Sequence, residues 1–138
     1  MISIHDHRLL AYHVDCEARQ ITLRTIFQDE EPHEKAQITF TGVLAYHFEG
    51  DAFGTILFDI TAVPPAEIVG QYAELFARLK NYGWPGPTYQ TPEELNQRLE
   101  GSGVTGYLIY SSCGMDGFVL AKRMEIRAAA AAPKSTRC

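Results

Sequence analysis

A regular alternation of apolar and other side chains between residues 38 and 48 constrains the fold of this chain more than any other feature. One face of the segment is apolar and comprises Ile38, Phe40, Leu44, Tyr46 and Phe48. A period of two is typical of a β-strand that buries one face. Gly42 interrupts the pattern at a position that suits a β-bulge. The segment therefore predicts a strand in a half-covered antiparallel sheet.

Five other segments predict strands of the same sheet. They cover residues 10–14, 21–27, 56–60, 104–110 and 118–126. The intervening turns and loops cover residues 17–19, 28–34, 49–54 and 111–117. The 28–34 loop is acidic and contains Pro32, which cannot donate a hydrogen bond to a strand ladder. The last two strands are expected to form a closing hairpin.

Two helices are predicted between the fourth and fifth strands. Apolar side chains adopt helical spacing after Pro64 and Pro65, in a stripe formed by Ile68, Tyr72, Leu75, Phe76 and Leu79. Gly83 is a suitable stop after Lys80. A second helix is expected to begin at Thr91, because Thr91-Pro92-Glu93-Glu94 matches a capping box, and to end at Gly101.

These elements predict a single α+β domain over residues 1–127. We expect a twisted, mainly antiparallel sheet of about six strands with two helices packed on one face. Residues 128–138 are alanine-rich and are expected to form a tail outside the fold. A chain of 138 residues can bury a normal core without covalent links.

Composition excludes several classes of protein. Hydrophobic residues make up 46% of the chain and charged residues 21%, as in ordinary globular proteins. No apolar run approaches the roughly 20 residues of a membrane helix. The first residues lack the basic and apolar regions of a signal peptide. We therefore expect a cytoplasmic protein of bacterial type, without a membrane partner.

The charge balance is acidic. The net charge is −5, and setting aside Lys134 and Arg137, the only charged residues of the tail, leaves −7 for residues 1–127. Nucleic-acid binding draws on clustered Lys and Arg, so we expect no nucleic-acid partner. An acidic surface suits a basic protein partner, although acidity also serves solubility alone.

Chemistry-bearing side chains gather at the amino end, in the cluster His5, Asp6, His7 and Arg8. Two histidines spaced by one residue on an extended segment could share a metal ion, with His13 or Cys16 as a further ligand. Zinc needs three or four convergent ligands, and His47 lies in another element. We therefore expect no metal or cofactor, and expect the cluster to serve the start of the first strand.

The three cysteines, Cys16, Cys113 and Cys138, include no close pair, which favours reduced thiols. Cys113 lies in a predicted turn, where a nucleophile can be held, but a thiolate needs an adjacent base that the sequence does not place. We expect a small residue in a tight turn.

Aromatic loops and an acidic loop are the candidate partner-binding features. Exposed aromatic side chains are enriched in the energetic centres of protein interfaces. The candidate residues are Asp29, Glu30, Glu31, Glu34, Phe53 and Trp84. The alternative is that Phe53 and Trp84 are core residues that pin their loops.

The start of the chain resembles small bacterial proteins of toxin-immunity families. The resemblance rests on His5-Asp6 leading to Leu10, on Val14-Asp15, Ile21 and Leu23, and on Phe40-Thr41-Gly42-Val43. The blocks at residues 45–51 and 82–85 are similar to uncharacterised bacterial proteins. The immunity resemblance implies an α+β fold and the binding of a partner protein without catalysis.

The leading functional hypothesis is thus a non-catalytic protein-binding module that neutralises a basic toxin by occlusion. A small-molecule-binding protein or a hydrolase remains the alternative, with His5, Asp6 and His7 joined by His47 and Cys113. A third possibility is a subunit that associates with itself through a sheet edge or the helical stripe.

Overall fold

The computed structural model describes residues 4–27 and 33–129. The elements, in chain order, are β1 (Arg8–Asp15), β2 (Gln20–Phe27), β3 (Glu34–Glu49), β4 (Ile56–Val63), α1 (Pro65–Gln71), α2 (Ala73–Leu79), the 3₁₀ turn η1 (Lys80–Tyr82), α3 (Pro92–Gly101), β5 (Thr105–Cys113) and β6 (Asp116–Ala128). The six antiparallel strands and the helices confirm the α+β class. The predicted strands all form, and β3 begins four residues before the predicted segment.

The strands are joined in the order β1-β2-β3-β6-β5-β4 and close into a barrel. Closure between β4 and β1 is short: Arg8 pairs with Ile56, and backbone hydrogen bonds join Asp6, His7 and Leu9 to residues 55 and 57. By contrast, β3 and β6 pair along most of their lengths, from Ala36 with Ala128 to Glu49 with Asp116. The barrel therefore has one weakly joined seam, between β1 and β4.

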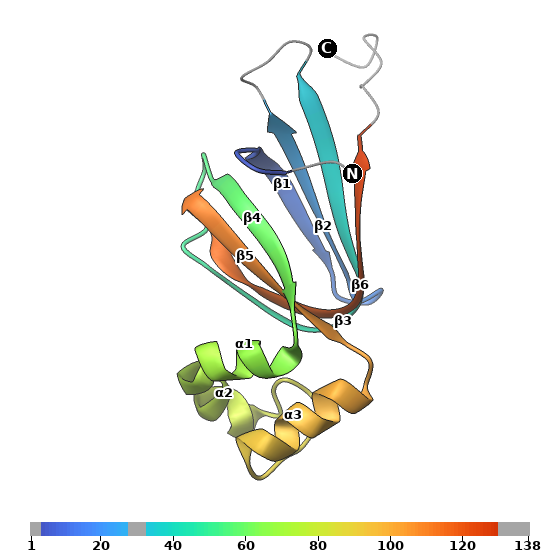
Figure 1. The fold of residues 1–138 in the computed structure, drawn as a ribbon, viewed down its shortest axis with the longest axis vertical. Coiled ribbons are helices and arrows are strands. Elements are labelled where there is room, and N and C mark those ends of the chain that lie inside the picture. The colour runs from blue at the N-terminus through green and yellow to red at the C-terminus, as the bar shows by residue number, and fades with distance from the viewer. Residues whose placement is uncertain (1–3, 28–32, 130–138) are drawn as a thin grey trace.

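Two apolar cores lie on opposite faces of the same strands. The interior of the barrel is filled by side chains that include Leu23, Ile38, Phe40, Val119 and Ile109. The second core joins the helices to β3, β5 and β6: Leu108, Phe118 and Leu120 belong to one buried cluster with Ile68, Phe76, Leu95 and Leu99. Figure 1 shows the helices gathered at one end of the barrel.

The first predicted helix is divided into α1 and α2. Tyr72 separates them with φ −112° and ψ 33°, outside the helical region. The structure thus contains three α-helices in its described part, where the sequence predicted two. Gly83, with φ 77°, ends η1 as the predicted stop. The break lets Tyr72 reach Phe118, with ring centroids 4.8 Å apart.

The second predicted helix forms as α3. The hydroxyl of Thr91 accepts a hydrogen bond from the backbone N–H of Glu94 at 3.1 Å, which satisfies a donor at the start of the helix. Glu94 in turn accepts a bond from the backbone of Gln90. The predicted cap at Thr91 and the end at Gly101 are confirmed, while the return bond of Glu94 goes to Gln90, one residue before the cap.

β3 is irregular near the predicted bulge, but its register shift against β6 lies two residues beyond Gly42. Gly42 has φ 64°, and the register with β6 shifts between Val43 and Ala45. Phe40 and Val43 both pack in the barrel interior, so the alternation changes face at Gly42, before the register shift, and Leu44 packs against the helix-side core. The assignment of Leu44 to the face of Ile38 is therefore wrong.

No helix within residues 4–27 and 33–129 is long and apolar enough to cross a membrane. Ala128 belongs to β6, where it pairs with Ala36, so the strand extends one residue into the predicted tail. Residues 130–138 lie outside the described residues.

Candidate functional site

The amino-terminal cluster divides into exposed and buried members. His5 and Asp6 are exposed, with His5 Nε2 3.4 Å from Asp6 Oδ2. His5 Nδ1 lies 3.0 Å from the carbonyl oxygen of Phe58, and the two rings meet edge to face. Asp6 has φ 63°, so the chain turns sharply before β1. These contacts fasten the start of the chain to β4.

His7 is the buried member, at 1% exposure. Its Nδ1 lies 2.8 Å from the hydroxyl of Thr25, which is itself buried, and its Nε2 lies 3.1 Å from Glu34 Oε1. Its ring stacks on Phe27. Both ring nitrogens are therefore engaged by β2 and β3. Glu34, predicted to bind a partner, contributes one carboxylate oxygen to this contact.

His47 lies in a different environment. Its ring contacts Tyr72 and Phe118, and its Nε2 is 3.9 Å from Glu49 Oε2. These contacts place it beside the helix-side core. Cys113, which is exposed, ends β5 opposite Ile56. Among the residues that the structure describes, no three His, Cys, Asp or Glu side chains are grouped to hold a metal ion.

The two candidate aromatic side chains have opposite environments. Trp84 is partly buried, with its ring centroid 4.8 Å from that of Phe76 and 6.2 Å from that of Phe118. Phe53 is fully exposed, at 108% of its reference area. Only Phe53 is therefore presented to a partner as an isolated apolar side chain. Asp29, Glu30 and Glu31 lie outside the described residues.

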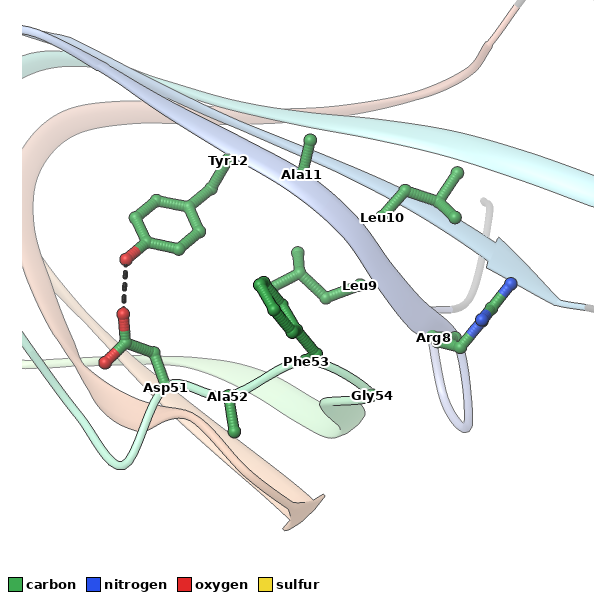
Figure 2. A pocket seen from close by; sticks show the side chains of 9 residues that line it. All are labelled: Arg8, Leu9, Leu10, Ala11, Tyr12, Asp51, Ala52, Phe53 and Gly54. Atoms are coloured by element: carbon green, nitrogen blue, oxygen red, sulfur yellow. Dashed lines mark hydrogen bonds between the residues drawn. The ribbon is translucent and has the colours of Figure 1, made fainter.

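Phe53 stands at a cavity of about 700 Å³ in the weak seam of the barrel. One wall is the first part of β1, and the other is the segment between β3 and β4; the lining comprises residues 8–12 and 51–54. We call this cavity the seam slot. Figure 2 shows Phe53 on the segment that lies opposite the first part of β1.

The seam slot has apolar sides and polar ends. Leu10 and Tyr12, which line the slot, are 40% and 39% exposed. The hydroxyl of Tyr12 donates a 2.6 Å hydrogen bond to Asp51 Oδ2 across one end, as Figure 2 shows. This bond, together with partial burial, raises the pKa of Tyr12 above its usual value. Arg8 lies at the other end.

The seam slot combines an apolar lining with a few polar groups. Its polar groups, a guanidinium, a carboxylate and a phenol, stand at the ends of an apolar surface, as in sites that orient a ligand by a few polar contacts. The sequence pointed to Arg8 and Phe53 separately. It did not point to Tyr12 and Asp51. The two residues are 39 positions apart, and nothing in the sequence links this tyrosine to this acid.

Comparison of the chain with protein-family models, curated proteins and solved structures gave no match.

Proposed function

We propose that this protein is a non-catalytic module that binds another protein at the seam slot. The observation that carries the proposal is Phe53, which is fully exposed beside Leu9 and Leu10. Aromatic side chains have large apolar surfaces at a low entropic cost of ordering and are enriched in interface hot spots. An exposed phenylalanine over a groove supports binding of an apolar group from a partner.

The partner is a basic protein. The chain carries a net charge of −5, and Asp51 adds a carboxylate at the slot itself. Opposite charge on a partner accelerates association and disfavours acidic competitors. The first half of the chain resembles toxin-immunity proteins. On this basis the biological role of the binding is the occlusion of a toxin in the bacterial cytoplasm.

A photo-reactive phenylalanine analogue placed at position 53 tests the proposal. The full-length protein is expressed in its native host and irradiated, and the linked protein is identified by mass spectrometry. We expect one basic protein, whose expression alone arrests growth and whose effect is relieved by co-expression of this chain. The same analogue at Tyr82, which is 83% exposed on the helical side, is the matched control.

The identified partner is then purified and titrated against variants by calorimetry. Phe53→Ser should weaken binding by about thirtyfold, since hot-spot truncations cost about 2 kcal/mol or more. Tyr82→Ser should leave the affinity unchanged. Equal crosslinking at both positions, or a partner that binds Phe53→Ser as tightly as the wild type, contradicts the proposal.

A further inference from the structure

We propose that the partner contributes an extended segment that lies in the seam slot antiparallel to β1, pairs with its free edge, and presents a basic side chain to Asp51. This inference rests on the proposed function, because it specifies which part of the partner is bound and how.

The free edge of β1 begins directly after the point of closure. The backbone N–H of Leu9 donates to the carbonyl oxygen of Thr55 at 2.9 Å, and that of Leu57 donates to the carbonyl oxygen of His7 at 2.8 Å. Within the described residues, no backbone hydrogen bond joins residues 10–15 to the segment before β4. Unpaired strand edges are templates for an additional strand.

The wall opposite this edge follows the direction of a neighbouring strand but stands away from β1. Because Arg8 pairs with Ile56 in antiparallel register, residues 51–54 run back along residues 10–12 of β1. The space between them amounts to about 700 Å³. At about 3.3 Å per residue, the stretch from Arg8 to Tyr12 spans roughly 13 Å, the length of about four residues of an inserted strand.

The side chains of the slot specify what the inserted strand carries. Asp51 accepts one hydrogen bond, from Tyr12, and its carboxylate can accept further bonds from a basic group. Leu9 and Phe53 form the apolar middle. Arg8 makes no ion pair with any other described residue, so its guanidinium is open to an acidic side chain.

Charge and pairing geometry favour one orientation. Every strand pair of the sheet is antiparallel, and antiparallel ladders are slightly more stable per residue than parallel ones. A segment antiparallel to β1 begins at the Asp51 end and finishes at the Arg8 end. Its order is therefore a basic residue, then apolar residues, then an acidic residue. The acidic net charge of the chain further selects a basic protein as its source.

Three capped peptides test this inference with the full-length protein. The first has the proposed order, Thr-Lys-Val-Thr-Val-Glu-Thr. The second exchanges Lys and Glu, and the third keeps the first sequence with alternate backbone nitrogens methylated. Binding is measured by fluorescence anisotropy at low salt. We expect the first peptide to bind, the second to bind about tenfold more weakly, and the third not to bind, because methylation removes strand hydrogen bonds.

Amide hydrogen exchange by NMR supplies a readout specific to strand addition. The first peptide should slow exchange at alternate amides of residues 10–15, where only one side of β1 is paired. Asp51→Asn should weaken binding of this peptide about tenfold. Glu100→Gln, which removes an exposed acid on α3, should leave it unchanged.

Three results would overturn the inference. The methylated peptide binding as well as the first would mean that the slot recognises side chains without strand addition. Failure of the first peptide to bind, or a preference for the exchanged order, would refute the proposed charge order. Protection of β1 that rises with protein concentration alone, together with a dimer by light scattering, would assign the edge to a second copy of the chain. Crosslinking at position 53 decides the proposed function separately from all three.

Discussion

His7 illustrates how burial sets the role of a single side chain. With both ring nitrogens engaged and its ring stacked on Phe27, it joins β1 to β2 and β3. A buried imidazole held on both sides is a structural link, because an unsatisfied ring nitrogen would cost about 1–3 kcal/mol. His5, two residues away, is exposed and packs on Phe58. The same residue type thus serves the interior and the surface.

Tyr12 and Asp51 form a hydrogen bond whose effect on the pKa of Tyr12 can be measured. The hydrogen bond to the carboxylate raises the pKa of Tyr12, because ionising the phenol would place two negative charges together. A raised folded-state pKa stabilises the fold fully below the unfolded value, and this stabilisation is lost as pH rises through the folded-state pKa.

Asp51→Asn should lower the pKa of Tyr12, because the amide still accepts the hydrogen bond but carries no charge. The measurement is the pH dependence of the tyrosine Cζ signal by NMR. Glu100→Gln is the control and should leave the titration of Tyr12 where it is in the wild type. A Tyr12 pKa that does not move in Asp51→Asn would show that the carboxylate is not its partner in solution.

At the scale of the elements, α1 packs closely against β5 at Gly106. A Cβ built on Gly106 would lie 2.5 Å from Ile68 Cδ1 and 3.1 Å from the carbonyl oxygen of Val63. Ile68 is fully buried, so it has little room to move away. The closeness of the helix to the sheet therefore depends on the absence of a side chain at this position.

A pair of glycine substitutions tests this packing. Gly106→Ala should destabilise the fold by about 1–3 kcal/mol through overpacking. Gly70→Ala, in α1, should stabilise it by about 0.5 kcal/mol, since its Cβ would meet nothing within 4 Å and alanine favours helix. Urea unfolding measures both free energies. Equal effects of the two substitutions would contradict the close contact.

Local sequence patterns predict the helices and strands better than the breaks and register shifts within them. The capping box at Thr91 and the alternation in β3 depend on neighbouring residues, so both can be recognised in the chain. At the break at Tyr72 the local signal is weak: Gly70 lies two residues before it, but the turned ring packs on Phe118, which is distant in sequence. Leu44 was misassigned for a related reason: the left-handed backbone at Gly42 changes which face the following side chains take, and the sequence alone does not show on which face they continue.

Across the whole molecule, two cores share the central strands. Val119 faces the barrel interior, while its neighbours Phe118 and Leu120 face the helices. Neither core can lose its order without disturbing β6. We therefore expect the barrel and the helices to unfold as one cooperative unit.

Leu23→Ala tests this coupling from the interior side. It should cost about 2–5 kcal/mol, because Leu23 is fully buried in the barrel. Trp84, the single tryptophan, reports from the helix-side core. Its fluorescence and the far-ultraviolet circular dichroism should shift to the same lower midpoint in denaturant. Leu95→Ala is the matched substitution in the other core, and separate midpoints in either variant would refute the coupling.

The seam slot is formed by two segments that are distant in sequence, residues 8–12 and 51–54, so the sequence did not predict it. Phe53 and Arg8 stand out locally, as an aromatic in a turn and a base at the start of a strand. Their common slot exists because the short closure around Arg8 and Ile56 joins the barrel and leaves the adjoining segments apart. No local pattern encodes how far two distant segments diverge.

The pairing of β3 with β6 also sets when the protein can fold during synthesis. Ala36 finds its partner at Ala128, so the longest ladder of the sheet joins an early segment of the chain to a late one. While the ribosome is still making the middle of the chain, the β1–β2–β3 meander has nothing to cover the far edge of β3. Folding therefore finishes only after β6 has emerged, and until then the edge of β3 that β6 covers stays unpaired.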